Sequence, residues 1–552
     1  MEAARPAGRA PPSARTKRLV LVAAILGTTV VTVDSTVVSI ALPAIADDLG
    51  GGLAGQQWTS NAYLVTLGSL LLIGGSLGDL FGERRVFTVG VLGFGVTSVF
   101  CALAPTIELL VISRALQGVF GALLTPAALA VIVGVFPPEE RGRAVGAWTA
   151  WGGIGTVLGP LIGGQLVDSA SWRWIFAINV PIVVVTLLLT LQVVPAGRER
   201  SADARVDIVG ALLCAFGLAG VTFGLIEQPL RGWGDPAVFL SMVVGALLFA
   251  GFIAWEERTD HPMLPLNLFR RRNFAIGNVE TFSMYAGLGL LFFFLVLFLQ
   301  QVAGYSALEA GTSSLPVTLV MFALSMRFGA LADRYGPRFF MGVGPLVAAA
   351  GLAWFLRLDA DVDYLTDLLP GLLVFSLGLA MTVAPLTATV LADADEANAG
   401  IASGVNNAIA RVASLVAIAG VGALVAASFG SALDDELGRA GLRPEVAAAV
   451  EEAKRQPLAD VVVEDAPPEV QREVAGASED ASITAFRVGI GIATLLVALG
   501  GVLGLIGIEN PRRRVEAEDC AGGQLVGHPR EGARQSPCDW NRPVDDRAPA
   551  TA

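Results

Sequence analysis

Two carboxylic acids, Asp34 and Glu280, interrupt long apolar runs of this sequence. A charge at the centre of a membrane helix costs about 2.5–3.5 kcal/mol on insertion scales, so such a group needs a partner or a function. A carboxyl in a low-dielectric cavity tends to hold its proton and to release it when its surroundings change. We therefore expect Asp34 to bind and release a proton or to recognise a cation. The alternative is a hydrogen bond to a neighbouring helix, with Thr32 or Thr36 as companions.

Glu280 is the second candidate for proton coupling or substrate binding. It lies in the first half of its apolar run, so its side chain could instead extend towards the basic residues at 270–272. Both histidines, His261 and His528, lie outside the apolar runs, so an imidazole relay within the membrane is excluded. Carboxylates are then the groups left to carry protons.

Other chemistry finds little support in the sequence. The cysteines lack CxxC or CxxH spacing, so we expect no metal site, and no cofactor beyond protons as the coupling ion. No nucleophile and base are grouped within the apolar runs, so we expect no enzyme. We expect a small hydrophobic substrate and the lipid bilayer as partners, with no nucleic acid, and nothing requires more than a monomer.

These residues must be positioned by membrane helices. Of the 552 residues, 54% are hydrophobic and 16% are charged, and runs such as 19–33 and 86–99 are apolar on all sides. A soluble helix would show a polar face, whereas apolar runs of about 20 residues span membranes. Division from turn to turn gives fourteen expected spans in an all-α integral membrane protein.

The basic residues of the short loops predict the orientation. Arginines are frequent in every second short loop, including Arg84 and Arg85, and lysine and arginine are retained on the cytoplasmic side. With an even number of spans, both termini are expected in the cytoplasm. The net charge of −12 reflects mainly an acidic segment at 427–482, expected outside, and the tail at 511–552, expected to be disordered inside the cell.

One charged pattern occurs twice, at a constant spacing and each time between two apolar runs. It consists of Gly75, Asp79, Gly82 and Arg84, which recur as Gly329, Asp333, Gly336 and Arg338. Gly82 would permit a tight turn, and Arg84 and Arg85 would anchor the cytoplasmic face. The chain therefore contains an internal repeat, with an equivalent short turn in each half.

Two further groups of residues favour close packing or a polar cavity. Gly155, Gly159 and Gly163 recur once per helical turn, with Pro160 interrupting the hydrogen-bond ladder and Gly164 beside them. Polar side chains within spans could line a cavity, or could be ordinary packing hydrogen bonds; they are Asn61, Tyr63, Gln117, Asn278, Asn406, Asn407 and Arg411.

Four stretches resemble the major facilitator superfamily, and specifically its fourteen-span drug:proton antiporters. They are the repeated turn, the run from Val33 to Pro43, the Arg114-Ala-Leu-Gln117-Gly118 sequence, and the Gly155 to Gly164 glycines. The resemblance implies two six-helix bundles at 18–195 and 273–510, two inserted helices at 206–258, and a cytoplasmic N-terminal tail at 1–17. It also implies that Asp79 pairs with Arg114 and with a helix N-terminus in the other bundle, as a latch that would break between conformations, and that Pro337 leaves Asp333 a weaker latch. The alternative is that Asp79 is a static anchor at the cytoplasmic face.

The function implied by the resemblance is export of hydrophobic or cationic drugs from the bacterial cytoplasmic membrane in exchange for protons. Two related halves facing a site at the midplane are typical of alternating access. Three alternatives remain open at this point: a facilitator of the same fold that imports a metabolite or moves a lipid, a channel or receptor, and a membrane-embedded enzyme.

Overall fold

The computed structural model describes residues 13–195, 207–392, 399–438, 450, 454 and 468–510. These residues form helices and turns, without a strand in the described ranges. The α-helices are α1 (Ala14–Leu49), α2 (Gly52–Phe81), α3 (Glu83–Ala102), α4 (Ile107–Val135), α5 (Pro138–Ser169), α6 (Trp174–Ala177), α7 (Asn179–Val193), α8 (Ile208–Arg231), α9 (Pro236–Glu256), α10 (Arg272–Gln301), α11 (Ala307–Ser313), α12 (Leu315–Tyr335), α13 (Pro337–Trp354), α14 (Leu369–Ala392), α15 (Ala399–Gly438) and α17 (Pro468–Gly507).

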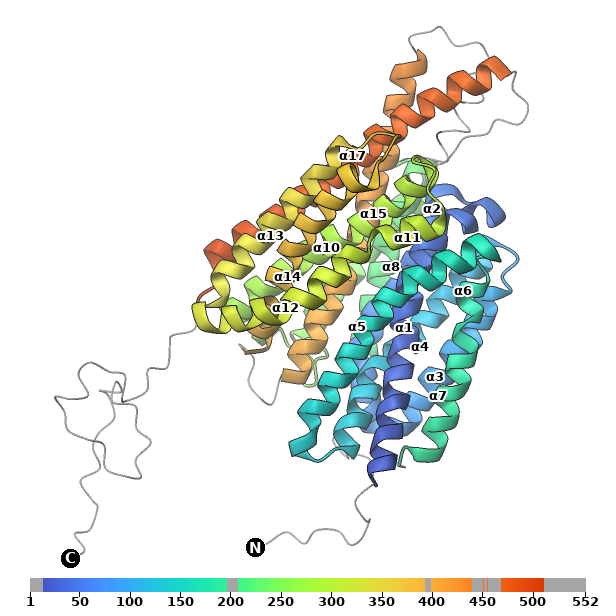
Figure 1. The fold of residues 1–552 in the computed structure, drawn as a ribbon. Helices are drawn as coiled ribbons and strands as arrows, with labels where there is room; N and C mark the ends of the chain where they lie inside the picture. The colour runs from blue at the N-terminus through green and yellow to red at the C-terminus, as the bar shows by residue number, and fades with distance from the viewer. Residues whose placement is uncertain are drawn as a thin grey trace, which may run out of the picture. The chain divides into compact units, whose positions relative to one another are not determined.

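The helices pack in two groups joined by a hairpin (Figure 1). Helices α1 to α7 contact one another and form the first bundle, and helices α10 to α17 form the second. The α8–α9 hairpin packs through α8 against α2 of the first bundle and α15 of the second. Leu218 of α8, Val65 of α2 and Leu415 of α15 share one buried apolar cluster. The boundaries expected from the sequence, at 18–195, 206–258 and 273–510, remain predictions.

The repeated pattern forms two equivalent turns. Gly82 separates α2 from α3 and has a φ of 90°, and Gly336 separates α12 from α13 with a φ of 92°. Residues with a Cβ rarely adopt this backbone conformation, so both positions favour glycine. Pro337 is the first residue of α13, where its missing N–H has no intrahelical acceptor to lose. We call the membrane end with these turns the turn end, and the opposite end the far end.

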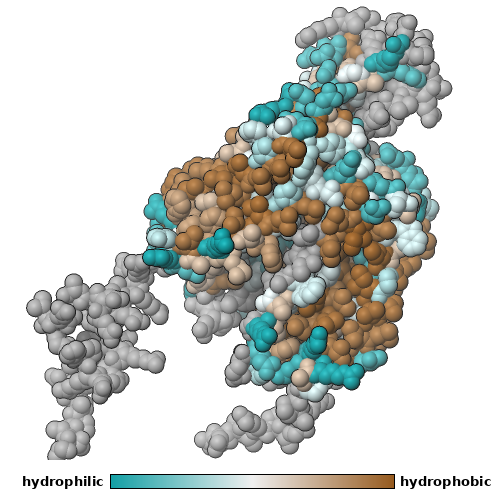
Figure 2. Space-filling view, viewed as in Figure 1, coloured by the Kyte–Doolittle hydropathy of each residue, from teal (hydrophilic) through white to brown (hydrophobic). Residues whose placement is uncertain are grey.

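The outer surface of the helices is apolar, as expected in lipid. Phe322 and Met326 of α12 are 76% and 84% exposed, and hydrophobic side chains cover the middle of the helices while polar ones gather at their ends (Figure 2). Twelve helices in the described residues are long and apolar enough to cross a membrane. Helices α2 and α5, at two of the expected spans, are not among the twelve, so the count of fourteen is not confirmed. Both helices contain positions outside the described residues, to which the count is restricted.

The acidic segment expected at 427–482 is partly helical. Helix α15 continues to Gly438, and α17 begins at Pro468, so both helices extend beyond the spans expected from hydrophobicity. Hydrophobicity reports the apolar part of a helix, whereas the backbone ladder continues into polar residues until a breaker or a cap stops it. The expected tail at 511–552 lies outside the described residues.

Candidate functional site

A buried ion pair occupies the interior of the first bundle. Arg114 Nη1 of α4 lies 2.5 Å from Asp34 Oδ2 of α1, and both side chains are almost completely inaccessible. Arg114 Nε also donates to the Thr59 carbonyl of α2, at 3.2 Å. The guanidinium lies 4.3 Å from the centroid of the Tyr63 ring, close enough for a cation–π interaction. Arginine suits such a site because its planar fork can bond in several directions at once.

Polar side chains from three further positions complete the shell of Asp34. Gln117 Nε2 and Asn179 Nδ2 both donate to Asp34 Oδ1, at 3.0 and 3.2 Å. Gln117 Oε1 accepts from Arg114 Nη1 at 2.6 Å, so this side chain bonds to both members of the pair. Ser98 Oγ accepts from Gln117 Nε2 at 2.9 Å. Asp34 thus has a counter-charge and two neutral donors, and we call these residues, with Tyr63, the Asp34 cluster.

The Asp34 cluster also contains polar atoms without partners. Within the described residues, the Tyr63 hydroxyl and Asn179 Oδ1 of this cluster are buried and make no hydrogen bond. Buried polar groups are usually satisfied, so two unpaired atoms in one cluster require an explanation. These atoms could bond to an incoming molecule or water without first breaking a bond within the protein.

The glycines of α5 bring this helix against α1, beside Asp34. A Cβ on Gly159 would lie 2.1 Å from Thr36 Oγ1, and a Cβ on Gly163 would lie 2.7 Å from Val37 Cγ1. A Cβ on Gly155 would lie 3.3 Å from Cγ2 of Thr29, which is also on α1. The backbone of α1 around Asp34 is therefore held at a distance that only glycine permits.

Gly164 turns to the opposite bundle, where it forms part of a contact at the far end. A Cβ on it would lie 2.5 Å from Leu308 Cα of α11. Helices α5 and α11 lie in contact across the two bundles (Figure 1). One turn later, Asp168 Oδ1 and Oδ2 accept hydrogen bonds from the backbone N–H groups of Ala307 and Leu308, at 3.0 and 2.9 Å. A carboxylate at the start of a helix is favoured by the helix dipole and by the unpaired N–H groups there.

Other hydrogen bonds between the bundles also lie at the far end. Gln300 Nε2, near the end of α10, donates to the Ile40 carbonyl of α1 at 3.0 Å. Gln57 Nε2, near the start of α2, donates to the Ile418 carbonyl of α15 at 2.9 Å. The far end is therefore closed in this conformation.

The polar residues expected to line a cavity are divided between the two bundles. Asn61, Tyr63 and Gln117 lie in the first bundle, with Asp34. In the second, Asn406 Nδ2 donates to Asn278 Oδ1 at 3.2 Å and to Thr281 Oγ1 at 2.7 Å. Asn407 is exposed and donates to the Ser403 carbonyl. Arg411 is half-buried and faces α2 of the first bundle, where a Cβ on Gly68 would lie 3.4 Å from the Arg411 Cβ.

Glu280 lies close to this second network but is not part of it. Its side chain is fully buried, and neither carboxyl oxygen has a hydrogen-bond partner within the described part of the chain. The expected alternative, an extension towards residues 270–272, is wrong. Arg272 donates instead to the Ile506 and Gly507 carbonyls at the end of α17.

The expected pairing of Asp79 with Arg114 is also wrong in this conformation, because Arg114 is bound to Asp34. Arg114 contacts Thr59, twenty residues before Asp79 on α2, which corresponds to about 30 Å along a helix. The side chain of Asp79 and the surroundings of Gly75 lie outside what the structure describes. Asp333 is exposed, and among the described residues it has no ion pair.

The arginines of the repeat make equivalent contacts. Arg84 Nη2 donates to the Leu191 carbonyl in the last turn of α7, at 2.7 Å, and Arg338 Nε donates to the Leu505 carbonyl in the last turn of α17, at 2.5 Å. Helix ends leave carbonyls without intrahelical donors, and a cation there is favoured by the dipole. Each repeat therefore fixes the last helix of its own bundle, and Pro337 does not weaken the second copy in this respect.

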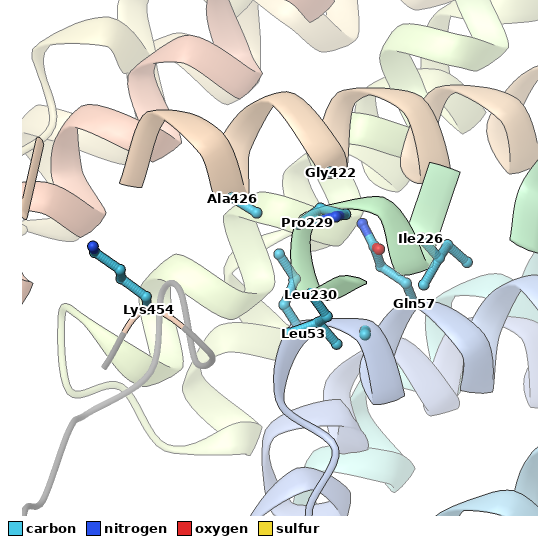
Figure 3. A pocket seen from close by; sticks show the side chains of 9 residues that line it. Leu53, Gln57, Ile226, Pro229, Leu230, Gly422, Ala426 and Lys454 are labelled. Atoms are coloured by element: carbon cyan, nitrogen blue, oxygen red, sulfur yellow. The ribbon is translucent and has the colours of Figure 1, made fainter. Parts of the chain in front are cut away.

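A small pocket at the far end is separate from these sites (Figure 3). It lies between α2, α8 and α15 and is lined mainly by apolar side chains, among them Leu53, Ile226 and Ala426. Gln57 at its edge already bonds to Ile418, and Lys454 pairs with Asp434 at 2.7 Å. We assign this pocket no role.

Sequence reasoning missed Ser98, Asn179 and Asp168. Ser98 and Asn179 are polar residues within apolar runs, the same signal that indicated Asn61. Asp168 lies just beyond the end of an apolar run, where a charged residue is ordinary. The Ser306-Ala-Leu-Glu309 sequence forms a capping box at the start of α11, and this S-x-x-E pattern could have indicated the helix start that Asp168 contacts.

A bundle of apolar helices around a buried polar site defines the chain as a multi-pass membrane protein of the transporter type. The family model described as "Major Facilitator Superfamily" matches residues 24–418. The chain belongs to this superfamily, whose members are transporters and not enzymes.

Several relatives cover most of the chain. The "Tetracenomycin C resistance and export protein" of Streptomyces glaucescens is 36% identical over 78% of this chain and 81% of its own length. The "Multidrug resistance protein Stp" of Mycobacterium tuberculosis is 30% identical over 88% of this chain and 91% of its own. A bacterial homologue of the lysosomal transporter Spinster, solved inward-facing and unoccupied, has a TM-score of 0.61 at 17% identity, covering 91% of this chain and all of that one; this likeness shows the fold alone.

Proposed function

We propose that this protein exports hydrophobic, cationic small molecules in exchange for protons, by alternating access of a site next to Asp34. The observation that carries the proposal is the buried Asp34–Arg114 pair with its unsatisfied polar neighbours. The names of relatives, which refer to tetracenomycin C export, puromycin resistance and multidrug resistance, support a drug as cargo.

Protonation is the step that changes the site. A proton bound to Asp34 neutralises the carboxylate, so Arg114 loses its counter-charge and keeps Gln117, the Thr59 carbonyl and the Tyr63 ring. When the proton leaves, the carboxylate can attract either Arg114 or a cationic molecule, and the two compete. Proton and cationic cargo thus exclude one another at the same carboxyl, which is what exchange requires.

The far-end contacts give the second half of the cycle. We infer that the turn end faces the cytoplasm of a bacterial cell, because Arg84, Arg85, Arg334 and Arg338 lie there. The closed far end then faces outward, and Asp168 and Gln57 hold it closed. Opening requires α5 to leave α11 and α2 to leave α15. An inward proton gives direction, since one charge crossing 100 mV is worth about 2.3 kcal/mol.

The test uses ethidium and purified protein in proteoliposomes with an imposed pH gradient. Asp34→Asn should lower gradient-driven ethidium transport to the rate of empty liposomes, whereas Asp47→Asn, an exposed carboxyl on the same helix, should keep the wild-type rate. Wild-type rates in Asp34→Asn would contradict the proposal. In intact cells, expression should lower ethidium accumulation, and an uncoupler should restore it; higher accumulation would favour an importer.

A further inference from the structure

Glu280 is a carboxyl that the proposed exchange at Asp34 does not use. It lies on α10, the first helix of the second bundle, as Asp34 lies on the first helix of the first. A Cβ on Gly504 of α17 would lie 2.9 Å from Glu280 Oε2, and a Cβ on Gly500 would lie 3.9 Å from its Cγ. The Met341 carbonyl of α13 lies beside Gly504. Glu280 is thus enclosed between three helices.

In the part of the chain that the structure describes, no arginine or lysine bonds to the Glu280 carboxyl. Helix α14 and the 496–507 part of α17 contain no charged residue. The basic residues on α10, α13 and α15 are Arg272, Arg338 and Arg411. Helix α17 carries Arg472 and Arg487 in its first half, towards the far end, where Arg487 pairs with Asp359. Arg272 and Arg338 donate to carbonyls at the end of α17, just beyond Gly504 towards the turn end.

The burial decides which form of Glu280 is present. An ionised carboxylate without a partner in an apolar interior is far more costly than its neutral form, so the group keeps its proton. Even the neutral acid leaves a donor and two acceptors unsatisfied, which costs stability relative to an apolar side chain of similar shape. A residue that serves packing alone would not need this acid, and ionisable groups inside membrane proteins commonly serve ion or proton pathways.

We propose that Glu280 is a second proton-binding site, separate from Asp34, which exchanges its proton with water at the turn end when α10 and α17 part. Gly500 and Gly504 allow close packing that keeps water out while the helices touch. When they part, the O–H bond breaks, the proton passes to water, and the carboxylate meets Arg272 and Arg338 at the mouth of the gap. Re-protonation allows the helices to close again.

Infrared spectroscopy of the purified protein in lipid nanodiscs tests the proposal without any substrate. The wild type should show the C=O band of a protonated carboxylic acid, which Glu280→Gln should lose and Asp34→Asn should keep. Glu256→Gln identifies the band of another buried carboxyl, whose Oε1 is unpartnered. In D2O the Glu280 band should shift as its proton exchanges.

Two results would overturn the proposal. If Glu280→Gln removes no acid band, Glu280 is ionised and is no proton carrier; if the band is present but never shifts in D2O, the acid is static. A role of this proton in transport rests on the proposed function. In the proteoliposome assay, Glu280→Gln should lower the number of protons exchanged for each ethidium transported. If ethidium export fails altogether while the band exchanges, the proposed function is wrong and the proton site remains.

Discussion

The first helices of the two bundles each carry one buried acid, and the two acids have opposite surroundings. Asp34 is bound by a guanidinium and by two amides, from helices α4 and α7. Glu280 has no partner for either oxygen and lies against glycines. The repeat therefore duplicated the scaffold, including the turn glycines and the capping arginines, without duplicating the polar interior.

This difference suggests that the two acids respond to different events. The charge of Asp34 is balanced in place, so a competing cation or a proton changes its partners while the helices stay packed. Glu280 has nothing to exchange partners with, so only a movement of α10 against α17 can change its state. A local exchange in one bundle and a packing change in the other would together link cargo to conformation.

The largest expected effect comes from removing one member of the pair. Arg114→Met should lower the free energy of unfolding by about 3–5 kcal/mol, because it leaves the Asp34 carboxylate buried without a counter-charge. Thermal unfolding of the purified protein in detergent measures this change. The double variant with Asp34→Asn should recover most of the loss. An equal loss in the single and double variants would show that Arg114 acts by packing alone.

The opposite sign is expected in the second bundle. Glu280→Met should raise the free energy of unfolding by about 1–3 kcal/mol, because it replaces an unsatisfied acid by an apolar side chain of similar length. The same thermal unfolding assay applies, with Glu280→Gln as the matched control, which should be nearly neutral. A destabilised Glu280→Met protein would mean that water or another group satisfies the carboxyl, and the contrast with Asp34 would disappear.

The scaffold was far more predictable than these interiors. The all-helical membrane fold follows from apolar runs, and the two turns follow from Gly82 and Gly336, because backbone conformation and burial in lipid are local properties of the sequence. The partner of Arg114 was predicted wrongly because pairing depends on depth along several helices. The pairing with Asp79 was implied by the family resemblance alone, and Asp79 lies about 30 Å along α2 from Thr59, which Arg114 contacts.

A smaller effect is expected where the bundles meet. Asp168→Asn removes the charge and one of two acceptors for the Ala307 and Leu308 N–H groups. Far-end opening should become easier by about 1.4 kcal/mol, roughly tenfold, within the range of a hydrogen bond to a charged group. The rate at which an impermeant maleimide labels a cysteine at buried Ile40, next to Gly311 of α11, reports the opening. Asp47→Asn is the control and should label at the wild-type rate. If Asp168→Asn also labels at the wild-type rate, Asp168 does not stabilise the closed far end.

The smallest effect compares the two capping arginines. Arg84→Met and Arg338→Met each remove a cation from the last turn of a helix, and each should lower the free energy of unfolding by about 0.3–1 kcal/mol. They should differ in their effect on Glu280. Without Arg338 the open carboxylate loses a nearby cation, so its proton should exchange more slowly in D2O, whereas Arg84→Met should leave that rate unchanged. Equal exchange rates in both variants would mean that Arg338 serves only as a cap, and that the carboxylate is stabilised by Arg272 or by water.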